Sequence, residues 1–348
     1  MRKITLLIAL MALAHGTVSA QGRRGTESTD LTYTILKDDV ENYKIARVGF
    51  SFLNTDISFA NVSAYGVGFF ANGEIGKKLY LEGNYSFSLV ERLLHPFEPD
   101  LQTDGFVSVN DDSRSNRLRL EGTYYFSSKT TREDIEVSLK QSTRGRTTVN
   151  YYTLVEGNQL TRIGARIGLD RGFTSYNMSS ADELSALLEN GSTYDINYDG
   201  EVIGSSFLTY SVMRLGVARS KLTNLHINTP QYGYRRSSSI AYLYGDVLIA
   251  MNQEIDDVFV KRNDVVVQSP FEGGPSTPYY SRMNLQDAVE FRNVGLAIGY
   301  RVNNLSTGFE QLVEAGIYPG VQGVNGLYIN IGWRYGLGTS QKIKENKK

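Results

Sequence analysis

The chain of 348 residues contains no cysteine, and this absence excludes a disulfide framework, a thiolate metal site and a cysteine nucleophile. Beyond its N-terminal segment it also lacks any run of 18 apolar residues, so nothing there could cross a bilayer as a helix. If the protein stands in a membrane, strands must carry it, because only helices and closed barrels satisfy their backbone there. Proline is scarce too: all seven prolines fall in predicted connections, where a missing N–H breaks no ladder bond.

An excess of positive charge is also absent. The formal net charge is −1, and the 36 basic residues fall to 34 against 37 acidic ones once Arg2 and Lys3 are removed. A nucleic-acid partner, which would require a basic surplus, is therefore not expected. Arg2 and Lys3 precede an apolar stretch at 4–14, and Val18-Ser19-Ala20 has the small-x-small pattern of a cleavage site. These features predict a signal peptide over 1–20, cleaved near Ala20.

What the chain does contain is a repeated period of two, which is the period of a β-strand. In the last such segment one face is continuously apolar or aromatic: Leu327, Ile329, Ile331, Trp333, Tyr335 and Leu337. The other face is small, polar or charged: Tyr328, Asn330, Gly332, Arg334 and Gly336. The pattern predicts twelve strands, at about 45–53, 62–71, 77–90, 115–127, 133–141, 146–155, 160–173, 204–219, 236–251, 290–303, 309–318 and 325–337. The segment 236–251 is ambiguous, because both of its faces are largely apolar.

These segments favour an all-β fold, a transmembrane antiparallel up-and-down β-barrel of about twelve strands over 45–337. The three longest connections (91–114, 174–203 and 252–289) all follow odd-numbered strands, as expected of external loops. Ser220–Tyr234 is long for a periplasmic turn, so fourteen strands is an alternative. A polar periplasmic segment at 21–44 precedes the barrel, with a short extra strand or a lumen insert at 31–36, and a basic tail follows at 338–348. A soluble β-sandwich or propeller is the competing interpretation, since alternation alone does not separate lipid from a protein core.

The polar face of the predicted strands gathers arginines and carboxylates at mid-strand positions. The candidate lumen residues are Arg47, Glu82, Arg117, Arg119, Glu121, Arg162, Arg166, Asp170, Arg301, Glu314 and Arg334. Arg214 and Glu136 share this face, with Lys78 and Lys140 nearby. One interpretation is a ladder of ion pairs that cross-links the strands and closes the interior, because charges held away from water are usually paired. The other is a narrow charged pore that favours anions. The 23 tyrosines suit a bilayer interface, where the ring is apolar and the hydroxyl stays wet.

Chemistry at individual sites has weaker support. Only His95 and His226 follow the predicted signal peptide, both in predicted connections and both interpreted as surface residues, so an enzyme is not expected and no cofactor is predicted. Asp195, Asn197 and Asp199 with Gly200 resemble the start of a calcium loop, but Ser206 stands where a bidentate glutamate is required. An Asx-rich turn is the favoured reading of that segment. A capping box at 180–183 predicts a short helix just before it.

The signal segment, the alternating strands and the aromatic-rich last strand resemble bacterial outer-membrane β-barrels, in a style similar to those of Bacteroidota. The resemblance implies location in the outer membrane of a Gram-negative bacterium, with outer-membrane lipid and other envelope proteins as partners. Three functions remain open. The first is a non-enzymatic structural or accessory component of an envelope assembly, with its external loops as the contact surface. The second is a narrow porin-like channel for small solutes, and the third is an outer-membrane hydrolase.

Overall fold

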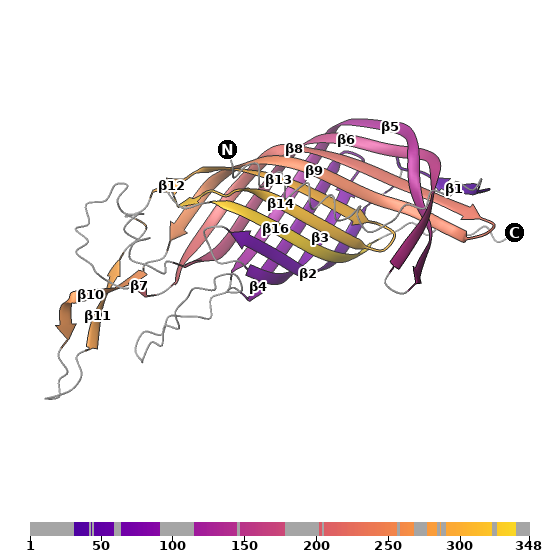
Figure 1. Cartoon of the computed structure of the whole chain (residues 1–348). Helices are drawn as coiled ribbons and strands as arrows, with labels where there is room; N and C mark the ends of the chain where they lie inside the picture. Colours follow the sequence, from indigo (N-terminus) through magenta and orange to yellow (C-terminus); the bar gives the residue numbers. More distant parts are fainter. Residues whose placement is uncertain are drawn as a thin grey trace, which may run out of the picture.

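The computed structural model describes residues 31–41, 43, 45–58, 64–90, 115–144, 147–177, 202–203, 205–255, 258–267, 277–283, 286, 290–321 and 326–338. Within them, ten antiparallel strands close into a barrel, because β8 pairs with both β6 and β9 (Figure 1). In order around the barrel they are β2 (Ala46–Ser58), β3 (Ala64–Ile75), β4 (Leu79–Val90), β5 (Asn116–Arg144), β6 (Thr147–Asn177), β8 (Ser205–Thr229), β9 (Gly233–Ile255), β13 (Val294–Asn304), β14 (Phe309–Ile317) and β16 (Leu327–Gly338). The expected closed antiparallel barrel is confirmed.

The predicted number of strands, twelve or alternatively fourteen, is wrong. The polar stretches 127–131 and 156–159 look like turns in the sequence, but they pair with partners inside β6 and β5 respectively. Each of these strands therefore replaces two predicted ones. The reason is exposure: beyond the bulge at Tyr125/Ser127, β5 has polar side chains on exposed positions, so its alternation weakens and resembles a turn.

The connection predicted at Ser220–Tyr234 is also strand. β8 continues to Thr229 and pairs with β9 from Gly233, so that only 230–232 form the turn. Residues 222–227 are buried on both faces, which removes the period of two from the sequence. Gly233 has a φ of 66°, a conformation that a glycine adopts without strain.

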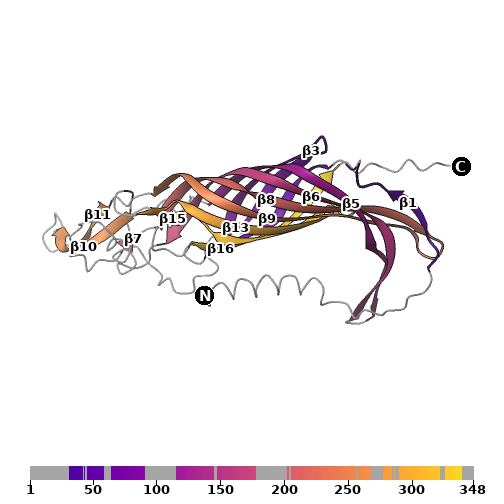
Figure 2. The same ribbon diagram turned by 90° about the horizontal axis from the view of Figure 1, so that it is seen from above.

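Two long hairpins, β5/β6 and β8/β9, project from the same end of the barrel. We call it the proximal end. The first barrel strand, β2, begins there and the last, β16, ends beside it, with Arg47 opposite Gly338. The β5/β6 hairpin beyond Gln159 leaves the wall and packs against β8 through the buried residues Ile135, Val137, Val155, Leu225 and Ile227. We call the part of this hairpin beyond the wall, 132–158, the arm. Figures 1 and 2 show it turning away from the barrel near the far end of β8 and β9.

The segment before the barrel packs into the proximal mouth. β1 (Thr34–Asp38) takes the place of β6 beside β8, pairing with 225–228, so the short extra strand expected near 31–36 lies outside the barrel. The Asp38 carboxylate accepts hydrogen bonds from the Asn158 backbone and side chain. Val40 and Ile45 are buried in a cluster with residues from five barrel strands: Tyr80, Tyr125, Leu160, Leu222, Ile240 and Tyr242.

The barrel wall has two unlike faces. In β16, Tyr328, Asn330 and Arg334 point inward and are buried, while Trp333 and Tyr335 are exposed, which confirms the faces predicted for the last strand. β9 resolves the ambiguous segment: its inward side chains include Tyr242, Tyr244, Asp246 and Leu248. Several tyrosines therefore line the interior, and the assignment of tyrosine to an interface alone was too narrow.

The opposite, distal end carries a small sheet made of β10 (Val258–Val267), β11 (Thr277–Met283) and β7 (Val202–Ile203), within the predicted connections 174–203 and 252–289. Pro278 lies in β11, contrary to the expectation that every proline avoids strands. β12 (Phe291–Arg292) pairs with β15 (Gly320–Val321). The signal segment, His95, the calcium-loop candidates and the helix at 180 fall outside the described residues, as do 339–348 of the tail. No helix in the described part of the chain is long and apolar enough to cross a membrane.

Candidate functional site: the charged lumen

The barrel interior contains equal numbers of positive and negative side chains. Counting only described residues with side-chain ion pairs inside the barrel, eight arginines face eight carboxylates, and all ten strands contribute. The arginines are Arg47, Arg117, Arg119, Arg162, Arg166, Arg214, Arg301 and Arg334. The carboxylates are Asp56, Glu74, Glu82, Glu121, Asp170, Asp246, Glu310 and Glu314. The formal charges of this set cancel.

Glu314 on β14 is the most heavily coordinated carboxylate. Its side chain is fully buried, and it accepts bidentate hydrogen bonds from Arg119 (2.8 and 3.0 Å) and from Arg214 (2.7 and 3.3 Å). The hydroxyls of Tyr244 and Tyr328 donate to the same carboxylate at 2.7 and 2.8 Å. Charge-assisted bidentate bonds are the strongest and most directional hydrogen bonds that proteins form. Glu314 therefore ties four other strands, β5, β8, β9 and β16, to β14.

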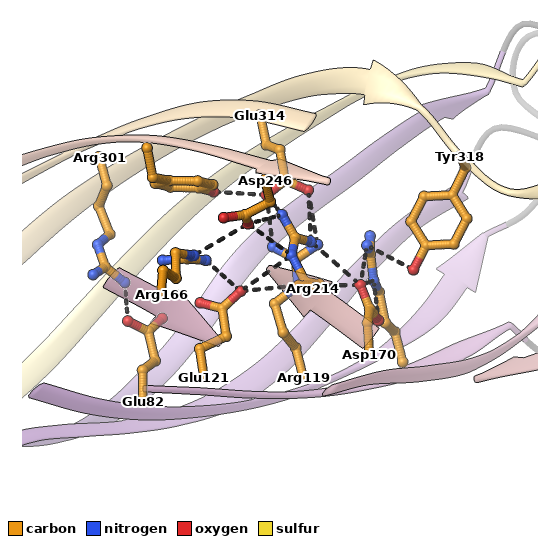
Figure 3. Close-up of polar contacts among 12 residues, drawn as sticks. Glu82, Arg119, Glu121, Arg166, Asp170, Arg214, Asp246, Arg301, Glu314 and Tyr318 are labelled. Carbon is orange, nitrogen blue, oxygen red and sulfur yellow. Dashed lines mark hydrogen bonds and ion pairs between the residues drawn. The ribbon is translucent and has the colours of Figure 1, made fainter. Parts of the chain in front are cut away.

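Arg214 on β8 is the cationic counterpart of Glu314. It is fully buried and contacts Asp246 at 2.9 Å and Asp170 at 3.4 Å, besides Glu314 (Figure 3). Asp170 also holds Arg117 at 2.5 Å, and Asp246 holds Arg166 at 3.1 Å. Each buried charge thus has several partners of the opposite sign, which offsets its removal from water.

A second group of charges lies nearer the proximal end. Glu82 on β4 pairs with Arg301 and, at 2.8 Å, with Arg334, and it accepts a hydrogen bond from the Tyr80 hydroxyl at 2.8 Å. Glu310 pairs with Arg47 at 3.0 Å and with Arg334 at 3.2 Å. Arg334 therefore links both carboxylates and connects the last strand to β4.

Two of these ion pairs span the barrel. β5 and β14 lie five strands apart around the ten-stranded ring, as do β4 and β13. Arg119 of β5 reaches Glu314 of β14, and Arg301 of β13 reaches Glu82 of β4. Because five strands is half the circumference, these side chains cross the lumen from one wall to the other.

Aromatic rings pack against the arginines. The guanidinium carbon of Arg166 lies 3.9 Å from the ring centre of Tyr244, that of Arg162 lies 4.2 Å from Tyr125, and that of Arg301 lies 4.5 Å from Tyr242. Such contacts add cation–π attraction and exclude water from the ion pairs. The Tyr244 ring lies against the inward glycine Gly299 on the neighbouring strand, where a Cβ would stand 2.2 Å from it.

All eleven lumen candidates predicted from the sequence have ion-paired partners in the barrel interior. Arg214 joins them at the centre, whereas Glu136, Lys78 and Lys140 are exposed and take no part. Four further lumen carboxylates were not predicted from the sequence: Asp56, Glu74, Asp246 and Glu310. Asp246 lies on the ambiguous strand, between inward tyrosines. Glu310 lies at the start of its strand, where too few residues precede it for the period of two to be recognised.

This arrangement does not offer an unpaired arginine to a passing anion. Every lumen arginine among the described residues has a carboxylate within 3.4 Å. An anion would have to displace a buried carboxylate that accepts charge-assisted hydrogen bonds, the stronger class of hydrogen bond in proteins. In the described part of the chain no group of three or more His, Asp or Glu side chains is arranged to hold a metal ion.

His226 lies where the sequence analysis did not expect it. The sequence predicts a surface connection for it, but it is a buried residue of β8, in the part of the strand that extends beyond the barrel wall. Its Nε2 lies 3.0 Å from the Asn224 side-chain oxygen, and its Nδ1 lies 2.7 Å from the Tyr234 hydroxyl. Ser238 also approaches Nε2, at 3.4 Å. Ser238 donates its hydroxyl hydrogen bond to the Asn224 side-chain oxygen at 2.8 Å, so this hydroxyl is directed at Asn224 and not at the histidine, unlike a serine that a histidine base activates.

The environment of His226 makes the β8/β9 hairpin sensitive to acid where it extends beyond the barrel. Burial, with Lys37 and Arg236 nearby, lowers the pKa of His226 to about 4 from its ordinary 6.5. Between these values the unfolded chain binds a proton that the folded chain does not, so stability falls as the pH falls through this window. We expect a loss of roughly 1–2 kcal/mol, less than full burial would give because the ring is only partly desolvated.

Hydrogen exchange of 222–238 at pH 7, 5.5 and 4 measures this effect. Protection should fall with pH in the native chain and change less in His226→Gln, which keeps a hydrogen-bonding side chain but cannot titrate. Equal pH dependence in both proteins would contradict the assignment to His226.

Comparison with known proteins identifies no family. No protein-family model and no curated protein sequence matches the chain. Among solved structures, it has a weak likeness to the anion-selective porin from Comamonas acidovorans: 9% identity over 88% of this chain and 100% of that chain, with a TM-score of 0.14. A likeness of this size transfers no activity, and the chain is therefore described by its architecture, a closed ten-stranded antiparallel β-barrel with one further strand outside it.

Proposed function

We propose that this protein is a non-enzymatic outer-membrane β-barrel whose lumen is locked by ion pairs and whose arm contacts another component of the cell envelope. Its outer wall supports the membrane location. Large apolar side chains are exposed all around the barrel, among them Phe50, Phe69, Leu81, Leu120, Ile167, Val217, Leu243, Leu296 and Trp333. In water such a surface would be a strong aggregation site, whereas in lipid it is the surface that a spanning barrel requires.

The pairs that cross the barrel carry the rest of the proposal. Arg119–Glu314 and Arg301–Glu82 each occupy a diameter of the ring. A ten-stranded barrel has little free bore once its side chains are counted. The N-terminal segment adds a second obstruction at the proximal mouth, through Val40 and Ile45. A structural role therefore fits better than solute passage.

The arm supplies a contact surface. It extends beyond the barrel and packs against β8 through a shared buried cluster, so it is a built element and not a loose loop. Tyr151 and Leu154 are exposed on it by 47% and 56%, which suits a protein contact in the aqueous compartment. The external loops named in the sequence analysis remain a second surface for partners.

Conductance in planar bilayers tests the closed lumen. The purified native protein should show no single-channel steps, because its diameter is filled by paired side chains. The positive control is a porin reconstituted in the same lipid. Regular anion-selective steps from the native protein would refute the proposal and favour the channel.

Co-purification in mild detergent tests the contact surface. A stoichiometric envelope partner should accompany the native chain, and the double variant Tyr151→Ser, Leu154→Ser should lose it. The matched control replaces the exposed arm pair Arg132 and Glu156 with serine, which removes two side chains from the same hairpin. If the partner is absent from the native protein, or if both double variants lose it equally, the arm is not the contact surface.

A further inference from the structure

The outer wall of the barrel is hollowed along one diagonal. A groove of about 1160 Å³ starts at the proximal rim on β2 and β16 and crosses β3, β4, β5 and β6 toward β8. We call it the outer groove. Its lining surface is almost wholly apolar, and its exposed side chains, among them Val48, Ala71, Leu81, Leu120 and Ile167, face away from the lumen. The lumen residues Arg47, Glu82 and Glu121 also border it, from the positions between them.

The sequence explains the hollow. One row of cross-strand partners runs Val48, Ala71, Gly83, Leu120, Leu169, Met213. The neighbouring row runs Ala46, Gly73, Leu81, Gly122, Ile167. Small residues thus sit together on β3 and beside leucines on β4 and β5, so that a depression forms between larger side chains. Because strands tilt in a barrel, a row of hydrogen-bonded partners climbs the wall from the rim.

A small polar pocket of about 180 Å³ adjoins the groove at the rim. We call it the rim pocket. Ala46, Arg47, Leu337 and Gly338 line both spaces, so the two lie side by side at the rim. The rim pocket is also lined by Tyr43, Thr307 and Arg236.

Arg236 gives the rim pocket a positive charge. It is exposed, and its guanidinium donates a hydrogen bond to the backbone carbonyl of Ser306. No carboxylate among the described residues forms an ion pair with it, in contrast to Arg47, whose charge is matched by Glu310. An arginine of this kind is suited to bind phosphate oxygens.

We propose that the outer groove and the rim pocket together bind one glycerophospholipid of the leaflet at the proximal end. Its phosphate contacts Arg236 in the rim pocket, and its acyl chains lie in the outer groove. An apolar channel that ends in a cation at the edge of the exposed apolar wall matches the polarity of such a lipid along its length. This assignment rests on the membrane location proposed above.

Native mass spectrometry of the protein in mild detergent tests the site. After delipidation, dioleoyl phosphatidylglycerol is added back and the bound fraction is measured. Arg236→Gln should weaken binding about tenfold, the loss expected for one charge-assisted hydrogen bond. Arg219→Gln is the control, because Arg219 is an exposed β8 arginine outside the rim pocket.

Filling the groove gives an independent test. Ala71→Leu adds bulk to an exposed outward position inside the groove and should reduce binding by a similar factor. Ala165→Leu makes the same change at an exposed outward position of β6 outside the groove. Excess inorganic phosphate should not compete, because it lacks acyl chains.

The outcomes are distinct. Equal lipid binding by each variant and its control would overturn the lipid site. Displacement of the lipid by inorganic phosphate would reduce the site to an anion pocket and overturn it as well. Release of the native protein into detergent-free washes of broken cells would instead refute the membrane location itself.

Discussion

Replacing Glu314 with glutamine should lower the free energy of unfolding by about 3–5 kcal/mol, the usual result of removing one partner from a buried ion pair. The side chain keeps its size, but Arg119 and Arg214 lose their common counter-charge. The set of eight arginines and eight carboxylates then has one uncompensated positive charge. Tyr244 and Tyr328 also lose an ionised acceptor. Urea unfolding followed by the fluorescence of Trp333, the single tryptophan, measures the change.

Asp56→Asn is the matched control. It removes a carboxylate from the same interior, but the Asp56 side chain is 38% exposed and contacts Arg117 at 3.4 Å. A pair that reaches solvent contributes at most about 1 kcal/mol, so this variant should unfold close to the native midpoint. If the two variants lose equal stability, the ion pairs across the lumen do not hold the barrel together.

Gly299→Val should be destabilising by about 3 kcal/mol or more, because it overpacks a filled interior. Gly299 on β13 lies directly opposite Tyr244 on β9, and a Cβ at this position would stand 2.2 Å from the tyrosine ring. The ring would have to leave, and its hydrogen bond to Glu314 and its contact with Arg166 would be lost with it. The same unfolding assay measures this loss.

Gly245→Val provides the comparison, because Gly245 belongs to a neighbouring strand but faces outward. A Cβ there would meet nothing closer than the backbone oxygen of Ala297 at 3.9 Å. Valine is also a favourable strand residue, so the protein should keep its stability within about 1 kcal/mol. Tolerance of valine at both positions would show that the Tyr244 ring is free to move.

Much of the barrel could be predicted because a wall with unlike faces leaves a period of two in the sequence. The inward and outward sides of 327–337 follow from that period alone. The number of strands could not be predicted, because the period fades wherever both faces have the same surroundings. Residues 222–227 are buried on both faces, and exposed polar residues follow the bulge in β5.

The candidate lumen residues could be predicted for a similar reason. When one face of a strand is apolar and faces outward, the charged side chains on its other face must point into the barrel. Their pairing was beyond the sequence. Arg119 and Glu314 are 195 positions apart, and only the order of strands around the closed ring shows that they meet across it. The outer groove was also hidden, because it depends on register: Ala71 and Gly83 form a hollow only as direct cross-strand partners.

Arg334, carried by the final strand, has a consequence for biogenesis. It is a shared counter-ion of Glu82 and Glu310, and Glu82 lies 252 positions earlier in the chain. Contacts between such distant positions form late, after the intervening chain has been ordered. A polypeptide that stops before this strand retains two acidic side chains with diminished compensation in its interior, and so pays an electrostatic penalty that the finished product escapes. A complete chain and a truncated one therefore differ in the electrostatic stability of the barrel interior.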